Sequence, residues 1–291
     1  MSTDSAILPV RRLILLHGLA STPKEFSLLH HPLRRLGLQL ECPTVPGYSH
    51  GMLATDARWT DWVDAATTAV AALLEDGEPA IIGGLCSGAM LALAVADRLP
   101  RAPLRGLALL SPLLAYNGWG LPWWYRLRHI AYGLGISRWF AMSEREPYGL
   151  KNERMRQWVR AQMDGVEATL VGPASVPLNV VRQSELLSRH ARSLLDEQHR
   201  PLLALHARED EICRLDTVRK AFERQRSGVA RLEVLENSYH MVSADNDRQQ
   251  VAELIAGFAA RLRPGGDHAR TASATHFPTS PRIADAYART S

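Results

Sequence analysis

The sequence predicts an α/β fold in which helices cover both faces of a doubly wound, mostly parallel sheet that carries an inserted helical cap. Three observations predict it. Short apolar segments alternate with helix-length amphipathic segments, a glycine-flanked turn joins one apolar segment to a helix, and one long interval interrupts the alternation. The chain has 291 residues and 46% hydrophobic content, which is enough to bury one large core. We therefore expect a single domain over residues 1–263, with a cap inserted at 113–185.

The strands are expected where apolar residues form short runs, at Arg12–His17, Leu38–Val45, Ala80–Gly84, Leu104–Leu110, Leu202–His206 and Arg231–Leu235. The helices are expected where apolar residues recur at intervals of three and four, at Lys24–Leu36, Thr60–Leu74, Ser87–Leu99, Leu215–Gln225 and Arg248–Leu262. Because a helix separates successive strands, neighbouring strands can run parallel.

The alternation stops between Ser111 and Arg200, an interval too long for a simple connection. It holds most of the 7 tryptophans, at Trp119, Trp123, Trp124, Trp139 and Trp158. We expect Trp139 and Trp158, which lie in helical patterns, to be packed in the core. Trp119, Trp123 and Trp124 lie in a segment broken by glycine and proline. For these three, contact with a bulky or lipid-like substrate is as strongly indicated as packing in the core. Residues 264–291 are rich in small and polar residues, which predicts a disordered tail.

Composition excludes several classes of function. The net charge of +4 comes without a long basic run, so the sequence predicts no nucleic-acid partner. Three cysteines without Cys-x-x-Cys spacing argue against a disulfide framework or a zinc site, and no phosphate-binding loop is present, so we expect no cofactor and no metal. The first residues lack a signal-peptide pattern and the longest apolar runs are too short to span a bilayer, so we expect a cytoplasmic protein without membrane insertion. The oligomeric state stays open.

The segment Gly84-Leu85-Cys86-Ser87-Gly88 matches a nucleophile elbow, Gly-x-Nuc-x-Gly, with cysteine at the apex. Only small residues fit two places before and after the apex. With Cys86 there, the flanks are Gly84 and Gly88, whereas Ser87 at the apex would place Leu85 in the crowded turn. The sequence therefore favours Cys86 as the nucleophile, and it argues against a dinucleotide-binding turn because Gly-x-Gly-x-x-Gly spacing is absent.

A thiol nucleophile needs a base, and the base needs a group that orients it. The strand that ends at His206 leads into an acidic turn, where Asp210 is preferred over Glu209 and Glu211 as the triad acid. His240 lies after the last strand and before the last helix, so Cys86, Asp210 and His240 follow the chain order nucleophile, acid, base.

Two backbone amides are candidates for the oxyanion hole. Leu19 follows the buried strand that ends in His17-Gly18, and Ser87 follows the nucleophile and opens a helix. His17 itself is interpreted as a packed histidine without a role in proton transfer.

These segments resemble the α/β-hydrolase family, in particular its capped bacterial carboxylesterases and monoacylglycerol lipases, from about Arg11 to Arg263. The resemblance implies a nucleophile at Cys86, an acid at Asp210, a base at His240 and oxyanion amides at Leu19 and Ser87. The cysteine is a departure, since those esterases use serine. It is similar to the cysteine of dienelactone hydrolases and polyhydroxyalkanoate synthases, although no acidic residue is expected beside His17-Gly18 as in the dienelactone hydrolases.

The function predicted on these grounds is hydrolysis of a carboxylic ester or thioester through a thioester acyl-enzyme on Cys86. The substrate is expected to be a small or carrier-bound, apolar acyl compound, with Trp119, Trp123 and Trp124 as candidate contacts. Two alternatives stay open. An acyltransferase or condensing enzyme would pass the acyl group to an acceptor other than water, and a hydrolase-like module could bind ligands without catalysis.

Overall fold

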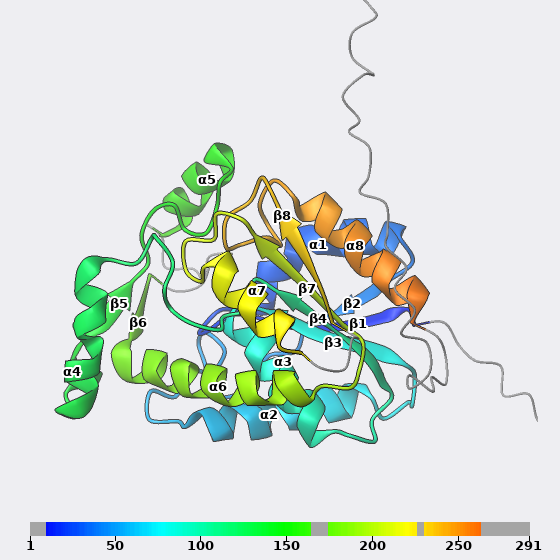
Figure 1. Cartoon of the computed structure of the whole chain (residues 1–291), viewed down its shortest axis with the longest axis horizontal. Helices are drawn as coiled ribbons and strands as arrows, with labels where there is room; N and C mark the ends of the chain where they lie inside the picture. The colour runs from blue at the N-terminus through cyan, green and yellow to red at the C-terminus, as the bar shows by residue number, and fades with distance from the viewer. Residues whose placement is uncertain (1–9, 164–173, 226–229, 263–291) are drawn as a thin grey trace, which may run out of the picture.

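A six-stranded parallel sheet forms the centre of the molecule (Figure 1). The computed structural model describes residues 10–163, 174–225 and 230–262. The strand order β2-β1-β3-β4-β7-β8 places β3 in the interior, with β1 and β4 on either side. The strands are β1 (Arg12–Leu16), β2 (Gln39–Glu41), β3 (Ala80–Leu85), β4 (Leu104–Leu110), β7 (Leu202–Ala207) and β8 (Ala230–Leu235).

Helices cover both faces of the sheet because successive side chains of each strand point to opposite sides. Ile14 and Leu16 of β1 pack into one core with α2 (Trp59–Leu73), α3 (Ser87–Arg98), α6 (Leu178–Glu197) and α7 (Leu215–Glu223). Leu13 and Leu15 pack into the other core, with α1 (Ser27–Arg35) and α8 (Arg248–Arg261). The predicted fold class is thereby confirmed.

The predicted element boundaries hold closely, with two informative differences. The helix predicted at Lys24–Leu36 is divided into a 3₁₀ turn, η1 (Pro23–Phe26), and α1. The strand predicted at Leu38–Val45 shortens to Gln39–Glu41, because this edge strand pairs only with β1 over three residues and Pro43 lacks a backbone donor.

The interval between β4 and β7 contains helical turns and a small antiparallel sheet in addition to α6. Its elements are η2 (Trp123–Leu127), α4 (Arg128–Gly133), η3 (Ser137–Trp139), β5 (Ala141–Ser143), α5 (Glu153–Met163) and β6 (Ser175–Pro177). The helix α6 continues past residue 185 and packs in the core with α3. A separate inserted cap at 113–185 therefore stays a prediction. The predicted tail, 264–291, lies outside the described residues.

The expectation that Trp139 and Trp158 are core residues is wrong. Trp139 is 71% exposed and Trp158 is 44% exposed. In α5 the neighbouring Val159 is the buried residue, so Trp158 lies on a different face of the same helix. No helix within the described ranges combines the length and the apolar character needed to cross a bilayer.

Gly88 lets the first turn of α3 approach the end of β1. A Cβ atom at Gly88 would lie 2.1 Å from the carbonyl oxygen of Leu16 and 2.3 Å from that of His17, both of which are backbone atoms that cannot turn aside. We expect Gly88→Ala to lower the free energy of unfolding by about 3 kcal/mol, measured as a shift in the denaturant midpoint. Gly133→Ala is the control, since a Cβ there meets nothing within 4 Å and should change stability by less than about 1 kcal/mol. Equal midpoints for the two variants would contradict the close approach.

Candidate active site

Cys86 occupies the turn between β3 and α3, with a backbone conformation that side-chain-bearing residues rarely adopt. Its φ is 58° and its ψ is −123°, and its N–H donates to the carbonyl of Leu110 at 3.0 Å. A Cβ on Gly84 would lie 2.4 Å from the carbonyl carbon of Gly88, so both flanks must be glycine. The strained turn directs the half-buried thiol into a cavity above the carboxyl ends of the strands.

Asp210 and His240 are joined by a hydrogen bond beside this thiol. Asp210 follows β7, and its Oδ1 accepts the N–H groups of Ile212 and Cys213 at 2.9 and 2.8 Å. Its Oδ2 accepts a hydrogen bond of 2.7 Å from Nδ1 of His240. Because Nδ1 is engaged with the carboxylate, Nε2 is the atom available for proton transfer, and both His240 and Cys86 line the same cavity.

The electrostatics of the pair favour a charged imidazole. Burial opposes protonation of His240, but the carboxylate of Asp210 and the nearby sulfur of Cys86 outweigh it and raise the pKa of His240 well above its ordinary value. Burial likewise opposes ionisation of Asp210, but His240, His206 and the hydrogen bonds hold the pKa of Asp210 below its usual range. A charged imidazole is therefore favoured at His240, beside the sulfur of Cys86.

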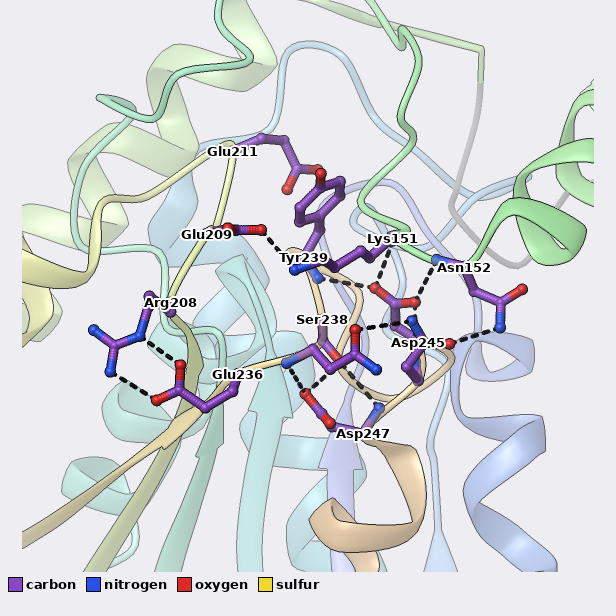
Figure 2. A network of polar contacts seen from close by, with 12 residues as sticks. Lys151, Asn152, Arg208, Glu209, Glu211, Glu236, Ser238, Tyr239, Asp245 and Asp247 are labelled. Atoms are coloured by element: carbon purple, nitrogen blue, oxygen red, sulfur yellow. Dashed lines mark hydrogen bonds and ion pairs between the residues drawn. The ribbon is translucent and has the colours of Figure 1, made fainter. Parts of the chain in front are cut away.

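The loop that carries His240 is fixed by the buried carboxylate of Asp245. Its Oδ2 accepts the N–H groups of Tyr239 and Lys151 at 2.8 and 2.7 Å. Its Oδ1 accepts that of Asn152 at 2.9 Å. Figure 2 shows this carboxylate between the His240 loop and the segment of Lys151 and Asn152. The Lys151 ammonium also pairs with Glu209 at 2.7 Å, which ties the same segment to the loop of Asp210.

The two amides predicted for the oxyanion hole lie close to Cys86, Ser87 as the next residue and Leu19 in the wall of the same cavity. Ser87 is the first residue of α3, where a helix leaves its N–H groups without intrahelical partners, and Leu19 lines the Cys86 cavity. Among the residues that the structure describes, neither the Leu19 nor the Ser87 N–H donates a hydrogen bond.

Two other buried histidines lie near the site but are engaged elsewhere. His17 donates from Nδ1 to the Gly18 carbonyl at 2.8 Å and accepts at Nε2 from Ser49 Oγ at 2.7 Å, and burial lowers the pKa of His17 to about 4. His206 donates from Nε2 to the Cys213 carbonyl at 2.8 Å. Its pKa is lowered by burial. Both donate a ring N–H to a backbone carbonyl and support the surrounding loops.

Three glutamates line the Cys86 cavity that sequence reasoning did not place there: Glu25, Glu144 and Glu211. The expectation that no acidic residue accompanies His17-Gly18 is wrong, because Glu25 Oε2 accepts the Gly18 N–H at 2.7 Å. Glu211, set aside as a triad acid, accepts the backbone N–H of His240 at 3.0 Å. No spacing signal identifies these residues, since they come from three separate segments and meet only in the fold.

Burial raises the pKa of Glu25 from 4.5 to about 7. The stability that Glu25 contributes in its neutral form is therefore fully present below pH 4.5 and is lost as the pH rises through about 7, because the unfolded chain ionises first. We expect Glu25→Gln to remove this loss, up to about 3 kcal/mol between pH 4.5 and pH 8, measured by denaturant unfolding at both pH values. Glu146→Gln, on an exposed residue paired with Arg160, is the control. An unchanged pH dependence in Glu25→Gln would contradict the assignment.

The candidate substrate tryptophans lie apart from the thiol. Trp119 and Trp123 line a second cavity, of about 900 Å³, whose walls share Tyr116 with the Cys86 cavity. Trp119 donates from Nε1 to the Glu209 carbonyl at 2.9 Å. Trp124 packs against the core and lines neither of these two cavities.

The fold is shared with many solved structures. A structure described as LipS and LipT, two metagenome-derived lipolytic enzymes, has 19% identity and a TM-score of 0.66, covering 87% of this chain and 95% of that chain. A Paleococcus ferrophilus monoacylglycerol lipase has 17% identity and a TM-score of 0.68, covering 88% and 97%. A Saccharomyces cerevisiae monoglyceride lipase with a substrate analogue has 15% identity and a TM-score of 0.69, covering 89% of each chain.

No curated protein matches the sequence. The model of the alpha/beta hydrolase family matches residues 13–254, a span that begins in β1, ends in α8 and includes Cys86, Asp210 and His240. The chain belongs to the alpha/beta hydrolase family.

Proposed function

We propose that the protein hydrolyses a carboxylic ester or thioester, with Cys86 as nucleophile, His240 as base and Asp210 as the orienting acid. The observation that carries the proposal is the 2.7 Å hydrogen bond from His240 Nδ1 to Asp210, which leaves Nε2 in the cavity that holds Cys86. The strained backbone at Cys86 adds support, since such strain persists where function requires it.

In the acylation step, the Cys86 thiolate attacks the substrate carbonyl carbon while the π electrons move to the oxygen. The N–H groups of Leu19 and Ser87 would stabilise the resulting oxyanion. The tetrahedral intermediate collapses by breaking the bond to the leaving group, which takes a proton from Nε2 of His240. A thioester on Cys86 and a neutral imidazole remain.

In the deacylation step, His240 takes a proton from water, whose oxygen attacks the thioester carbonyl. Collapse of the second intermediate releases the carboxylic acid and restores the imidazolium beside the thiolate. Asp210 compensates the imidazolium charge in the resting enzyme and after the proton transfer from water, as the orienting carboxylate does in serine-protease triads.

Acyl transfer is a second candidate because the cavity is narrow. Its volume is about 80 Å³, and Met142, Tyr148 and Val176, from the interval between β4 and β7, form part of its wall. A narrow, covered site can admit an acceptor and limit the access of water, and a thioester reacts readily with amines and thiols.

A panel of short and medium acyl esters and acyl thioesters tests both candidates. Hydrolysis predicts Cys86-dependent release of free acid, whereas transfer predicts a coupled product that forms faster than free acid when an amine or thiol acceptor is added. If no substrate gives either product, while the protein is folded, the proposed activity is refuted and the ligand-binding alternative gains support.

A further inference from the structure

The Cys86 cavity is acidic, and its carboxyl groups converge from separate parts of the fold. Glu25 belongs to η1 after β1, Glu144 follows β5, and Glu211 lies in the loop that carries Asp210. Within the described ranges, none of the three forms an ion pair with a lysine or arginine. Placing three carboxyl groups in a partly buried cavity costs stability, so a ligand that compensates them is expected.

Most carboxyl oxygens in this cavity retain free acceptor capacity. Glu25 and Glu211 each use one oxygen to accept a backbone N–H, from Gly18 and from His240. Glu144 makes no side-chain hydrogen bond to any described residue. One deeply buried hydroxyl of the same cavity, Oγ of Ser21, makes no hydrogen bond of ordinary geometry to a described residue, although it lies close enough to Glu25 to lower the pKa of that carboxyl. These open positions surround the nucleophile, where a substrate has to bind.

We propose that the substrate carries an ammonium group within a few bonds of the carbonyl that Cys86 attacks, and that Glu144, with Glu25 and Glu211, binds it. The inference rests on the proposed function and specifies its substrate class. It differs from the apolar acyl group that the tryptophans indicate, two of which, Trp119 and Trp123, line the second cavity. An organic cation is favoured over a metal ion because the described His, Cys, Asp and Glu residues form no group suited to holding a metal.

The titration of the three carboxyl groups is compatible with this role. Burial raises the pKa of each of Glu25, Glu144 and Glu211 to about 7, and the charge of His240 opposes that shift in every case. Near neutral pH these groups are partly protonated, so an entering ammonium would stabilise their ionised form. A neutral substrate of the same shape gains no such interaction.

The charge preference can be measured on Cys86 without turnover. Three methanethiosulfonates that modify thiols, carrying aminoethyl (cationic), propyl (neutral, isosteric) and carboxyethyl (anionic) groups, are compared by their modification rates at pH 7, followed by intact mass and peptide mapping. Each rate is divided by the rate with N-acetylcysteine to remove intrinsic reactivity. Cys42 and Cys213 are poor competitors because burial raises the pKa of each to about 12.

We expect the aminoethyl reagent to exceed the propyl reagent by tenfold or more after this correction, and the carboxyethyl reagent to be slowest. Glu144→Gln should reduce the ratio of the aminoethyl rate to the propyl rate by about tenfold. Glu146→Gln, two residues away and exposed, is the matched control and should keep the preference. Equal corrected rates for the three reagents in the wild type, or a preference that Glu144→Gln does not change, would overturn the proposal.

Propylammonium gives an independent readout on the wild-type protein, since it should slow modification by the propyl reagent.

A substrate series then locates the positive charge within the substrate. β-Alanyl and butyryl thioesters place it on the acyl side, and butyrate esters of dimethylaminoethanol and 3-methylbutanol place it on the leaving group. The cationic member of one pair should show a kcat/KM about tenfold higher, and Glu144→Gln should remove this difference. A charge preference in labelling without turnover of any ester or thioester would refute the proposed function and retain the cation site. Turnover without a charge preference would refute the cation site and retain the proposed function.

Discussion

The Cys86→Ala variant is expected to lose acyl release almost completely, with kcat falling by about 10⁶-fold, as found when the nucleophile is removed from a triad that acts as a unit. The thiol is the only group at the strained apex between β3 and α3, and the neighbouring Ser87 is the first helical residue and directs its hydroxyl to Ser184 at 3.0 Å. Alanine fits the same backbone, so the variant should fold. The measurement is product release from the ester and thioester panel.

Cys42→Ala is the matched control for this substitution. Cys42 is the other half-buried thiol, and it does not line the Cys86 cavity, so its loss should leave kcat within about twofold. If activity survives in Cys86→Ala and disappears in Cys42→Ala, the nucleophile is Cys42 and the assignment to Cys86 is wrong. Activity that survives in both would exclude a thiol mechanism at either position.

Asp210→Asn is expected to lower kcat by about 10⁴-fold, the loss seen when the corresponding carboxylate of a serine-protease triad becomes an amide. An asparagine can still accept the Ile212 and Cys213 N–H groups, which preserves the turn. It removes the negative charge that holds the pKa of His240 above its ordinary value, so less imidazolium would be present. The drop in kcat should be accompanied by a lower apparent pKa for the imidazolium in the pH profile of acylation.

Glu209→Gln is the matched control for Asp210→Asn. The Glu209 carboxylate lies next in sequence, is about half exposed, and pairs with Lys151, so this change should alter kcat by less than about threefold. Retention of activity in Asp210→Asn, together with its loss in Glu211→Gln, would identify Glu211 as the orienting acid. Glu211 is the alternative to test because its carboxylate also contacts His240, by accepting the His240 backbone N–H.

The arrangement of the sheet could be predicted because its causes are local. The runs at Arg12–Leu16 and Leu104–Leu110 are apolar apart from Arg12 and Arg105, and each strand fills two cores by alternation. The elbow could also be placed, since the small flanks Gly84 and Gly88 are a steric requirement visible in the sequence. Asp210 and His240 could be paired by their position after β7 and β8, because the carboxyl ends of parallel strands meet at one edge.

The acidic character of the cavity could not be predicted, because it depends on long-range packing. Glu25 and Glu144 lie in segments whose relative position is set by tertiary contacts, and nothing in their spacing relates them to Cys86. The exposure of Trp139 could not be predicted either, because a single 3₁₀ turn has too few residues to reveal which side faces water.

The central claim, that Cys86 carries the acyl group, is tested most directly by intact-protein mass after brief exposure to acyl esters and thioesters, with acid quenching and peptide mapping. The account predicts a mass increase equal to one acyl group on the peptide that contains Cys86, absent in Cys86→Ala and slower to form in Asp210→Asn. Product release without any adduct on Cys86 at the shortest times, or an acyl group found on another residue, would contradict it.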